Sequence, residues 1–509
     1  MRKREIALGQ WILLGLSLAL CAPGALRAQT SSAVPQIVQS ASCPDSVAAP
    51  GNPISSAPDY YCPLPEPATG GNTVMVAFLA DDTGTPTFTV TDNMSDSFTI
   101  ASSCKDIDAN NRIFFLAYSV GVKSGARVID IHATSLGAGY WTPQVAEFTG
   151  IGAFDTCRFS AGASASTNVS AGSITPTGAG ELLTQWAFSS SATVQTGVFT
   201  VGSQPNISWQ FAHESVYDAD AMQYGIYSAT AAITPAFTAA KADTWDSIAA
   251  FFIPGSAGAM PTQSQRIDHI LHLNVMTGQG LTTLKAGFPS VGNEIVLSSF
   301  WGQGTCIKSV SDSNSNTWHN TGSCYNGGSA TTYVSRWYCY PCSTSSNMAI
   351  TVTVNTAGDG TILFYDILGG GGFDKTSGGQ VGSSNAHNAT LTTCSDCITP
   401  SGSGEVVFSE GGWDNGTASG MSSPSGGLFD AAYFSGNSYN GPQTVDQNNE
   451  ASHYYTTSAA PLTYTWNMLL SAGEGVGSWS DLEDVFKTGS GLTPAPPTGL
   501  TGTVSSSGQ

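Results

Sequence analysis

One phrase of fifteen residues occurs twice in this chain, 220 positions apart. Residues 90–104 read VTDNMSDSFTIASSC, and residues 310–324 read VSDSNSNTWHNTGSC. The alignment pairs Asp92 with Asp312, Phe98 with Trp318, and Cys104 with Cys324. A chain that repeats itself over this distance is expected to contain two copies of one folding unit.

The correspondence continues on both sides of this phrase, in the same order. Four further pairs of segments align: 72–82 with 293–303, 147–155 with 366–374, 174–188 with 398–412, and 243–252 with 477–486. The offset drifts from 219 to 234 residues, as expected if loops change length while strands persist. We predict two tandem domains, 33–256 and 260–488, each of ~220 residues and large enough for its own core.

The two ends of the chain fall outside these domains. Residues 1–28 combine a basic start, an apolar run that is too short to span a bilayer, and small residues suited to cleavage after Ala28. This pattern predicts a secretory signal peptide, and no later stretch is apolar enough to cross a membrane. Residues 489–509 are expected to be a flexible tail or the start of a truncated further module.

Composition narrows the class of protein. Without residues 1–28 the chain has 12 basic and 35 acidic residues, and such an acidic surface repels phosphate backbones, so no nucleic-acid partner is expected. Charged residues make up only 10%, yet hydrophobic residues reach 41%, which indicates a folded chain. The abundance of Thr, Val, Tyr and Gly favours strands and turns.

Short alternating apolar segments such as 72–82 and 112–120 are separated by Gly, Asn, Asp and Pro throughout. We read the alternation as half-buried strands, about eight to ten in each copy. The predicted fold class is all-β, with two tandem antiparallel β-sandwich domains of Ig-like or jelly-roll kind.

The entry phrase V(T/S)D…(F/W), followed by TP…G.GE(L/V)(L/V), resembles repeats of large exported bacterial proteins of uncharacterised function. The resemblance covers most of both copies, and implies an Ig-like or jelly-roll fold and export. It implies no catalytic residues, because its motifs are those of turns and strands. The segment 492–509 is similar to the linker and first strand of a fibronectin type III module.

Ten cysteines follow the predicted signal peptide, four in the first copy and six in the second. They are Cys43, Cys62, Cys104, Cys157, Cys306, Cys324, Cys339, Cys342, Cys394 and Cys397. Even numbers in an exported chain predict disulfides within each domain, and we favour Cys306–Cys324 across the entry hairpin. For the CxxC pairs at 339–342 and 394–397, structural disulfides are preferred over a four-thiolate zinc site or a redox motif.

Acidic and amide side chains in two segments are weak candidates for calcium ligands, since calcium takes oxygen ligands from loops. The candidates are Asp106, Asp108, Asn110, Asp312, Asn314 and Asn316. Ordinary turn chemistry is the favoured alternative, because Asn and Asp bond to their own backbone. No cofactor other than calcium is expected.

Aromatic side chains near Asn, Asp and Gly suit glycan recognition or a protein interface, although many fill sandwich cores. The candidate binding residues are Trp141, Trp209, Trp413, Tyr433, Tyr439 and Tyr454.

These features predict a secreted, non-catalytic binding or adhesion protein at the cell surface or outside the cell, with a glycan or a surface protein as partner. Self-association into an extracellular filament or layer is the alternative. A polysaccharide hydrolase or lyase is the second alternative, with Glu410 and Asp414 as candidate carboxylates.

Overall fold

The computed structural model describes residues 33–489 with short gaps. The gaps are 44–45, 48–58, 82–86, 108–111, 135–139, 163, 190–198, 216–219, 257–259, 262–264, 276–279, 303, 323, 327–331, 359, 384–389, 415–416, 435–446 and 470–477. The described residues form 34 strands and no helix, which confirms the all-β prediction. The predicted signal peptide and the segment 490–509 lie outside the described residues.

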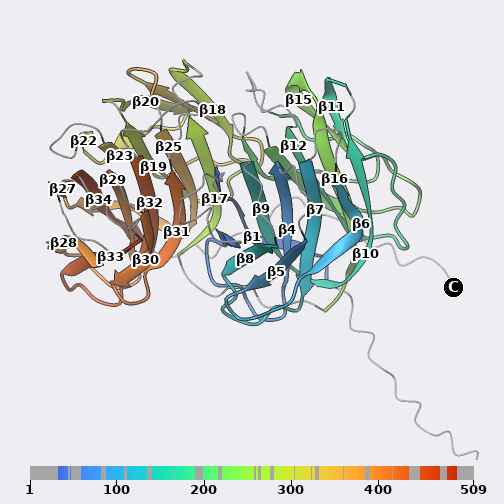
Figure 1. The fold of residues 1–509 in the computed structure, drawn as a ribbon, viewed down its shortest axis with the longest axis horizontal. Helices are drawn as coiled ribbons and strands as arrows, with labels where there is room; N and C mark the ends of the chain where they lie inside the picture. The colour runs from blue at the N-terminus through green and yellow to red at the C-terminus, as the bar shows by residue number, and fades with distance from the viewer. Residues whose placement is uncertain are drawn as a thin grey trace, which may run out of the picture.

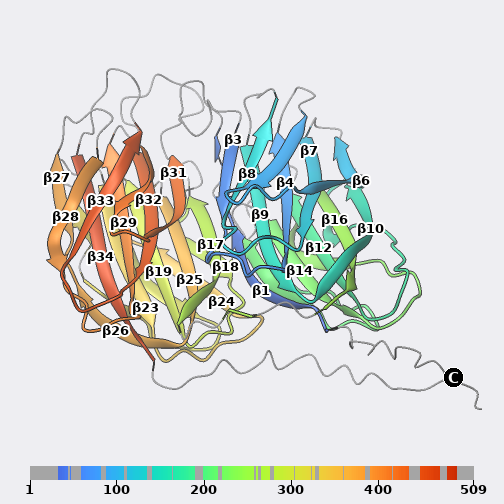
Figure 2. The same cartoon turned by 90° about the horizontal axis from the view of Figure 1, so that it is seen from below.

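One sheet of 12 strands runs through both repeats (Figures 1 and 2). Its main path is β21 (His319–Asn320), β23 (Thr332–Cys339), β19 (Glu294–Gly302), β25 (Gly360–Leu368), β17 (Arg266–Val275), β1 (Gln36–Ser42), β9 (Tyr140–Thr149), β4 (Thr73–Asp81), β7 (Arg112–Val120) and β6 (Thr99–Ile107). The short strands β2 (Ser46–Val47) and β22 (Tyr325–Asn326) pair with β9 and β23. We call it the shared sheet.

The repeats meet at the centre of the shared sheet, where β1 and β17 pair in parallel with Ser40 opposite His269. Every other strand pair in the described part of the chain is antiparallel. From this join outward, each repeat contributes equivalent strands in the same order, with β9, β4 and β7 matching β25, β19 and β23.

Three further sheets belong to the first repeat. They are β3 (Asp59–Pro63), β8 (Val128–Ala133) and β5 (Phe88–Asp92); β10 (Ile151–Ala161), β16 (Trp245–Pro254), β12 (Glu181–Ser189), β14 (Asp220–Tyr227) and β13 (Gln210–Ser215); and β11 (Ser166–Ser170) with β15 (Ala236–Asp243).

The second repeat contributes three sheets in matching order. They are β18 (Thr283–Gly287), β24 (Ala349–Val354) and β20 (Ile307–Asp312); β26 (Gly370–Thr376), β34 (Ser478–Thr488), β29 (Val406–Asp414), β32 (Gln447–Tyr455) and β31 (Leu428–Phe434), with β27 (Gln380–Ser383) on β34; and β28 (Thr390–Ile398), β33 (Leu462–Leu469) and β30 (Thr417–Ser423).

The shared sheet is covered on both faces. In β4, Val76 and Phe78 pack in one core with Ile131 of β8, whereas Met75 packs in another core with Trp186 of β12. Strand β4 is therefore buried on both sides, and its alternation does not mark a solvent face. The expectation of half-buried strands was wrong for this strand, because a second sheet lies on the face that the pattern assigned to water.

The two repeats lie turned over relative to each other about the join. The core that contains Ile131 of the three-stranded sheet in the first repeat also contains Phe408 and Phe486 of the larger sheet in the second. On the opposite face, Phe211 of the first repeat shares a core with Leu284 and Ile350 of the second. Parallel pairing of equivalent strands requires this inversion, since a two-fold axis along the strands exchanges the faces of the sheet.

The structure thus differs from two separate two-sheet sandwiches in two ways. One sheet continues from one repeat into the other, and each repeat stacks more than two sheets. The number of strands also exceeds the predicted eight to ten in each copy. The described residues form 16 strands in 33–256 and 18 in 260–488. Single glycines with positive φ, Gly150 and Gly369, divide apolar runs that the sequence pattern presents as continuous.

The starts of β1 and β17 lie at the same end of the molecule because these strands are parallel. The last strand of each repeat also finishes there, since the amide of Gly255 donates to Gly150 and that of Gly489 donates to Gly369, each at 2.8 Å. The amide of Ala33 donates to the carbonyl of Gly255 at 3.0 Å. Both repeats are therefore entered and left at one pole of the fold.

Candidate functional site

A set of buried charged side chains joins the two repeats beside β8, β31 and β32, and we call it the inter-repeat network. Arg127 Nη2 lies 2.9 Å from Asp430 Oδ1, and His453 Nδ1 lies 2.8 Å from the same oxygen. His453 Nε2 faces Glu66 Oε1 at 3.7 Å, and the Tyr455 hydroxyl donates to that oxygen. Two of these charged groups come from each repeat.

The electrostatics of the inter-repeat network favour charged side chains despite burial. Burial alone would lower the pKa of His453, but the charges and hydrogen bonds of Asp430 and Glu66 outweigh it and raise the pKa to about 9. Burial would raise the pKa of Glu66, yet bonds from His453, Tyr455 and the Ile267 amide lower it overall. The negative charges of Asp430 and Glu66 are therefore neutralised by Arg127 and a protonated His453. These ion pairs connect the two repeats at the join.

A second buried cluster surrounds Arg336 on β23. Arg336 Nη1 lies 3.0 Å from Asp484 Oδ2, its Nε donates to Ser298 Oγ at 2.8 Å, and its Nη2 is 3.9 Å from Glu410 Oε2. Burial raises the pKa of Glu410 to about 8, although the charge of Arg336 opposes this. Glu410 has no exposed surface, and the side chain of Asp414 is not described, so the structure does not bring these candidate hydrolase carboxylates together on a surface.

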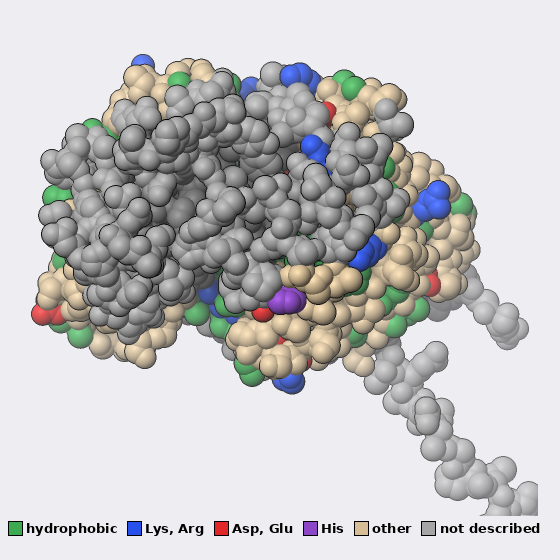
Figure 3. Space-filling model, in the orientation of Figure 1, with side chains coloured by type: hydrophobic (Ala, Val, Ile, Leu, Met, Phe, Trp, Pro, Cys, Tyr) green, Lys and Arg blue, Asp and Glu red, His purple; other side chains and the backbone are tan. Residues whose placement is uncertain are grey.

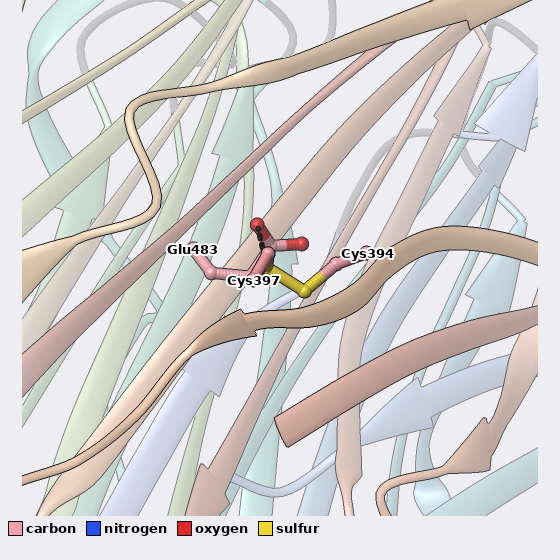
Figure 4. A group of neighbouring side chains, drawn as sticks. All are labelled: Cys394, Cys397 and Glu483. Atoms are coloured by element: carbon pink, nitrogen blue, oxygen red, sulfur yellow. Dashed lines mark hydrogen bonds between the residues drawn. A yellow bond between two sulfur atoms is a disulfide. The ribbon is translucent and has the colours of Figure 1, made fainter. Parts of the chain in front are cut away.

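The opposite face of β34 carries two more buried acids, Asp481 and Glu483. Thr393 and the indole of Trp466 donate to Asp481 Oδ2. Glu483 Oε2 lies 3.5 Å from Cys397 Sγ, and Oε1 has no hydrogen-bond partner among the described residues. Figure 4 shows the Glu483 carboxylate beside the disulfide that Cys397 forms with Cys394.

The sulfur atoms of Cys394 and Cys397 and an oxygen of Glu483 all lie within 4.8 Å of one another. Among the residues that the structure describes, these three form the only such group of potential metal ligands. Burial raises the pKa of Glu483 well above its usual range, and the neighbouring Asp481 charge adds to this. The thiols of the two CxxC pairs do not meet, because Cys339 ends β23 in the shared sheet whereas Cys394 lies in β28.

The ten cysteines form five disulfides, each within one repeat, as predicted. The pairs are Cys43–Cys62, Cys104–Cys157, Cys306–Cys324, Cys339–Cys342 and Cys394–Cys397. The favoured Cys306–Cys324 pairing is confirmed, and each CxxC motif closes on itself.

Carboxylates at equivalent positions in the two repeats bind backbone amides. Glu147 Oε1 accepts from Asn72 Nδ2 at 2.5 Å and from the Thr69 amide at 3.0 Å, just before β4. Asp366, its counterpart on β25, accepts from the Val291 amide at 2.9 Å, just before β19. Each acid holds the loop that leads into the neighbouring strand.

The calcium candidates in the second repeat serve a turn. Asp312 Oδ1 accepts the amides of Asn314 at 2.8 Å and Asn316 at 3.2 Å, and both asparagines donate their side-chain amides to the Ser343 carbonyl. Asp92 makes the same two backbone bonds at 2.8 and 3.0 Å. These are the bonds to the nearby backbone that Asp and Asn make in ordinary turns, and calcium binding stays a prediction.

The other calcium candidates are less completely described. Asp106 lies in β6, but its side chain is outside the described residues, as are Asp108 and Asn110 entirely. The structure therefore describes the side chains of only one of the two candidate calcium segments.

The aromatic candidates fall into two groups. Trp209 and Tyr454 are buried, and the Trp209 indole donates to Gln204 at 2.6 Å, so neither presents a ring face to a ligand in this structure. They fill the interior because each packs under a neighbouring sheet. Trp141, Trp413 and Tyr433 lie in strands with side chains that are not described, and Tyr439 lies outside the described residues.

Sequence reasoning missed the inter-repeat network. Glu66, Arg127, Asp430 and His453 have no counterparts in the repeat alignment and come together only through the inverted arrangement of the repeats. A usable signal was present, because Asp430 and His453 interrupt apolar strand patterns in a chain with few charged residues. A charge inside such a pattern predicts a buried partner.

Searches against family models, curated proteins and solved structures found no match to this chain. In the described part of the chain, no helix is long and apolar enough to cross a membrane.

Proposed function

We propose that this chain is an extracellular, non-catalytic binding or adhesion protein that recognises a glycan or a surface protein. The observation that carries the proposal is the location of the acids. Glu410, the candidate hydrolase carboxylate whose side chain the structure describes, is fully buried and lies 3.9 Å from Arg336 within the protein. Because this buried acid interacts only within the protein, we assign ligand recognition to side chains on the surface.

The surface and the covalent framework support this proposal. On the face seen in Figure 3, charged side chains are scattered among uncharged polar and backbone atoms wherever residues are described. Five disulfides suit an oxidising compartment outside the cytosol. The Ig-like or jelly-roll kind of each repeat and the exported location belong to the same proposal, with calcium as the one candidate ion for the Asp and Asn turns.

The decisive experiment is binding of the purified protein to a polysaccharide and glycan array, with calcium and with a chelator. Selective binding that falls at least tenfold in Trp413→Ala supports the proposal. Val291→Ala is the control, since Val291 is 59% exposed and is not one of the aromatic candidates. A blank array with folded protein, together with ordered assemblies in electron micrographs, would instead favour the filament.

A further inference from the structure

We propose that reduction of the Cys394–Cys397 disulfide creates a binding site for one thiophilic divalent cation such as Zn²⁺, with Cys394, Cys397 and Glu483 as ligands. The inference goes beyond the proposed function and does not depend on it. The three side chains come from two different sheets, since β28 supplies the cysteines and β34 supplies Glu483.

The donor atoms already have the spacing of ligands on one ion. A tetrahedral zinc ion with a Zn–S bond of about 2.3 Å and a Zn–O bond of about 2.1 Å holds those two donors about 3.6 Å apart. Cys397 Sγ and Glu483 Oε2 are 3.5 Å apart. Once the disulfide opens, rotation of the cysteine side chains suffices to place both sulfurs on the ion, as in other Cys-x-x-Cys sites.

A second, independent observation points to a ligand. Glu483 is fully buried beside the carboxyl of Asp481, and no N–H or hydroxyl donor among the described residues reaches its Oε1. The hydroxyl of Tyr464, which lies opposite Cys394 across the strand pair, is also buried without a partner. Buried polar atoms normally have partners, and a bound cation would provide one for the carboxylate.

The repeat alignment supplies a comparison inside the same molecule. Extending the alignments of 174–188 and 243–252 without gaps places Ser170, Ser173 and Ala249 opposite Cys394, Cys397 and Glu483. The strand register agrees, since Ala249 lies opposite Gln185 as Glu483 lies opposite Ser409. All three ligand residues are specific to the second repeat, although the fold of the first forms without them. The fold alone therefore does not require the trio.

The chemistry balances with a reductant supplied from outside. A thiol or phosphine reductant donates two electrons, and two protons complete the conversion of the disulfide to two thiols. The cation then displaces the two thiol protons as the sulfurs bind. Cys397 is only half-buried, so it offers the point of entry, while Cys394 and Glu483 are shielded from water. The fourth position is left for water.

The test uses the full-length protein, reduced by a phosphine without oxygen and titrated with Co²⁺, whose tetrahedral thiolate complexes absorb in the visible and near ultraviolet. Mass spectrometry of alkylated samples establishes that Cys394 and Cys397 are reduced. We expect one Co²⁺ per chain in the reduced protein, displaced by Zn²⁺, and none in the oxidised protein.

Three variants separate this site from non-specific binding. Cys394→Ser/Cys397→Ser/Glu483→Ala copies the residues of the first repeat, so it should fold and lose the spectrum. Glu483→Gln should weaken binding about tenfold to hundredfold. Cys339→Ser/Cys342→Ser removes the other CxxC pair and should leave the spectrum unchanged. An unchanged spectrum in the triple variant, or no spectrum in folded protein with both thiols reduced, would overturn the proposal. So would a disulfide that resists reduction until the protein unfolds.

Discussion

The indole nitrogen of Trp318 donates to Asp312 Oδ2 at 2.6 Å, and this bond has no counterpart in the first repeat. There Phe98 occupies the equivalent position and has no N–H to offer to Asp92. The two backbone bonds to each aspartate agree, and Ser95 and Ser315 both have positive φ, at 57° and 60°. The indole bond is thus an addition of the second repeat to a turn whose backbone bonds to the aspartate are shared.

Exchanging these aromatic residues should move that bond between repeats. Trp318→Phe is expected to lower the free energy of unfolding by about 1–2 kcal/mol, because an acceptor loses its donor. Burial, opposed by two backbone amides, raises the pKa of Asp92, and Phe98→Trp should lower that pKa by adding a donor. Urea denaturation and NMR titration measure the two effects. An Asp92 pKa that stays unchanged in a folded Phe98→Trp variant would contradict the assignment.

The inter-repeat network should be costly to break. Asp430→Asn is expected to destabilise the protein by about 3–5 kcal/mol, because the buried Arg127 loses its ion-pair partner and shares Glu66 with His453 as the remaining counter-charge. Lys123→Met provides the control, since Lys123 is 55% exposed in its ion pair with Asp96 and should change stability by less than about 1 kcal/mol. Chemical denaturation of both variants measures the change in the free energy of unfolding. Equal losses of stability would show that the inter-repeat network does not stabilise the join between the repeats.

Stability should fall as pH rises from about 6.5 to 9; below pH 6.5, His269 and His272, whose pKa values burial lowers to about 3, act in the opposite direction. Burial raises the pKa of Glu410 and of Glu294 to about 8, so the folded protein holds protons there that the unfolded chain has released. The contribution of His453, whose pKa is raised to about 9, is complete below pH 6.5 and is lost as pH rises through 9. Each such proton gives a slope of at most about 1.4 kcal/mol per pH unit.

Glu410→Gln isolates one part of this pH dependence. The variant should match the parent protein near pH 4, where the carboxyl is neutral in both states, and should exceed its stability above pH 8. Thermal denaturation across that range measures the difference. A parent protein that becomes more stable between pH 6.5 and 9 would show that these side chains are ionised in the fold.

The disulfides should differ in their contributions according to the length of chain that each closes. Cys104–Cys157 spans 53 residues and should contribute about 4 kcal/mol, whereas Cys339–Cys342 spans 3 and should contribute about 2. Replacing each pair with serine and measuring unfolding in urea tests the order. The reverse order would mean that local geometry outweighs loop length.

Local features of this fold were predictable from sequence, and the relations between repeats were not. The alignment of Asp92 with Asp312 and of Glu147 with Asp366 holds at the level of individual hydrogen bonds, because turns and loop contacts are encoded by nearby residues. The parallel pairing of β1 with β17 leaves no pattern in either strand, since β1 (QIVQSAS) and β17 (RIDHILHLNV) mix polar and apolar residues in a way that does not depend on the direction of the neighbouring strand.

The candidate site shows the same limit. CxxC spacing predicts that Cys394 and Cys397 lie together, but nothing in the sequence brings Glu483, 86 residues further on, to Cys397. That contact depends on β28 packing over β34. Likewise, the aromatic pattern could not distinguish a binding ring from a core ring such as Trp209, because burial depends on which sheet covers the strand.

Both repeats begin and finish at one pole of the fold, and this decides which side of the molecule an attached neighbour would occupy. Any neighbouring domain, anchor or filament subunit attached beyond Ala33 or Gly489 would be tethered on that side. The far pole, where β1 and β17 end, would then point away from the attachment with both repeats side by side (Figure 2). Because β1 and β17 run in the same direction, both repeats would present the same ends of their strands to a ligand that approaches from that side.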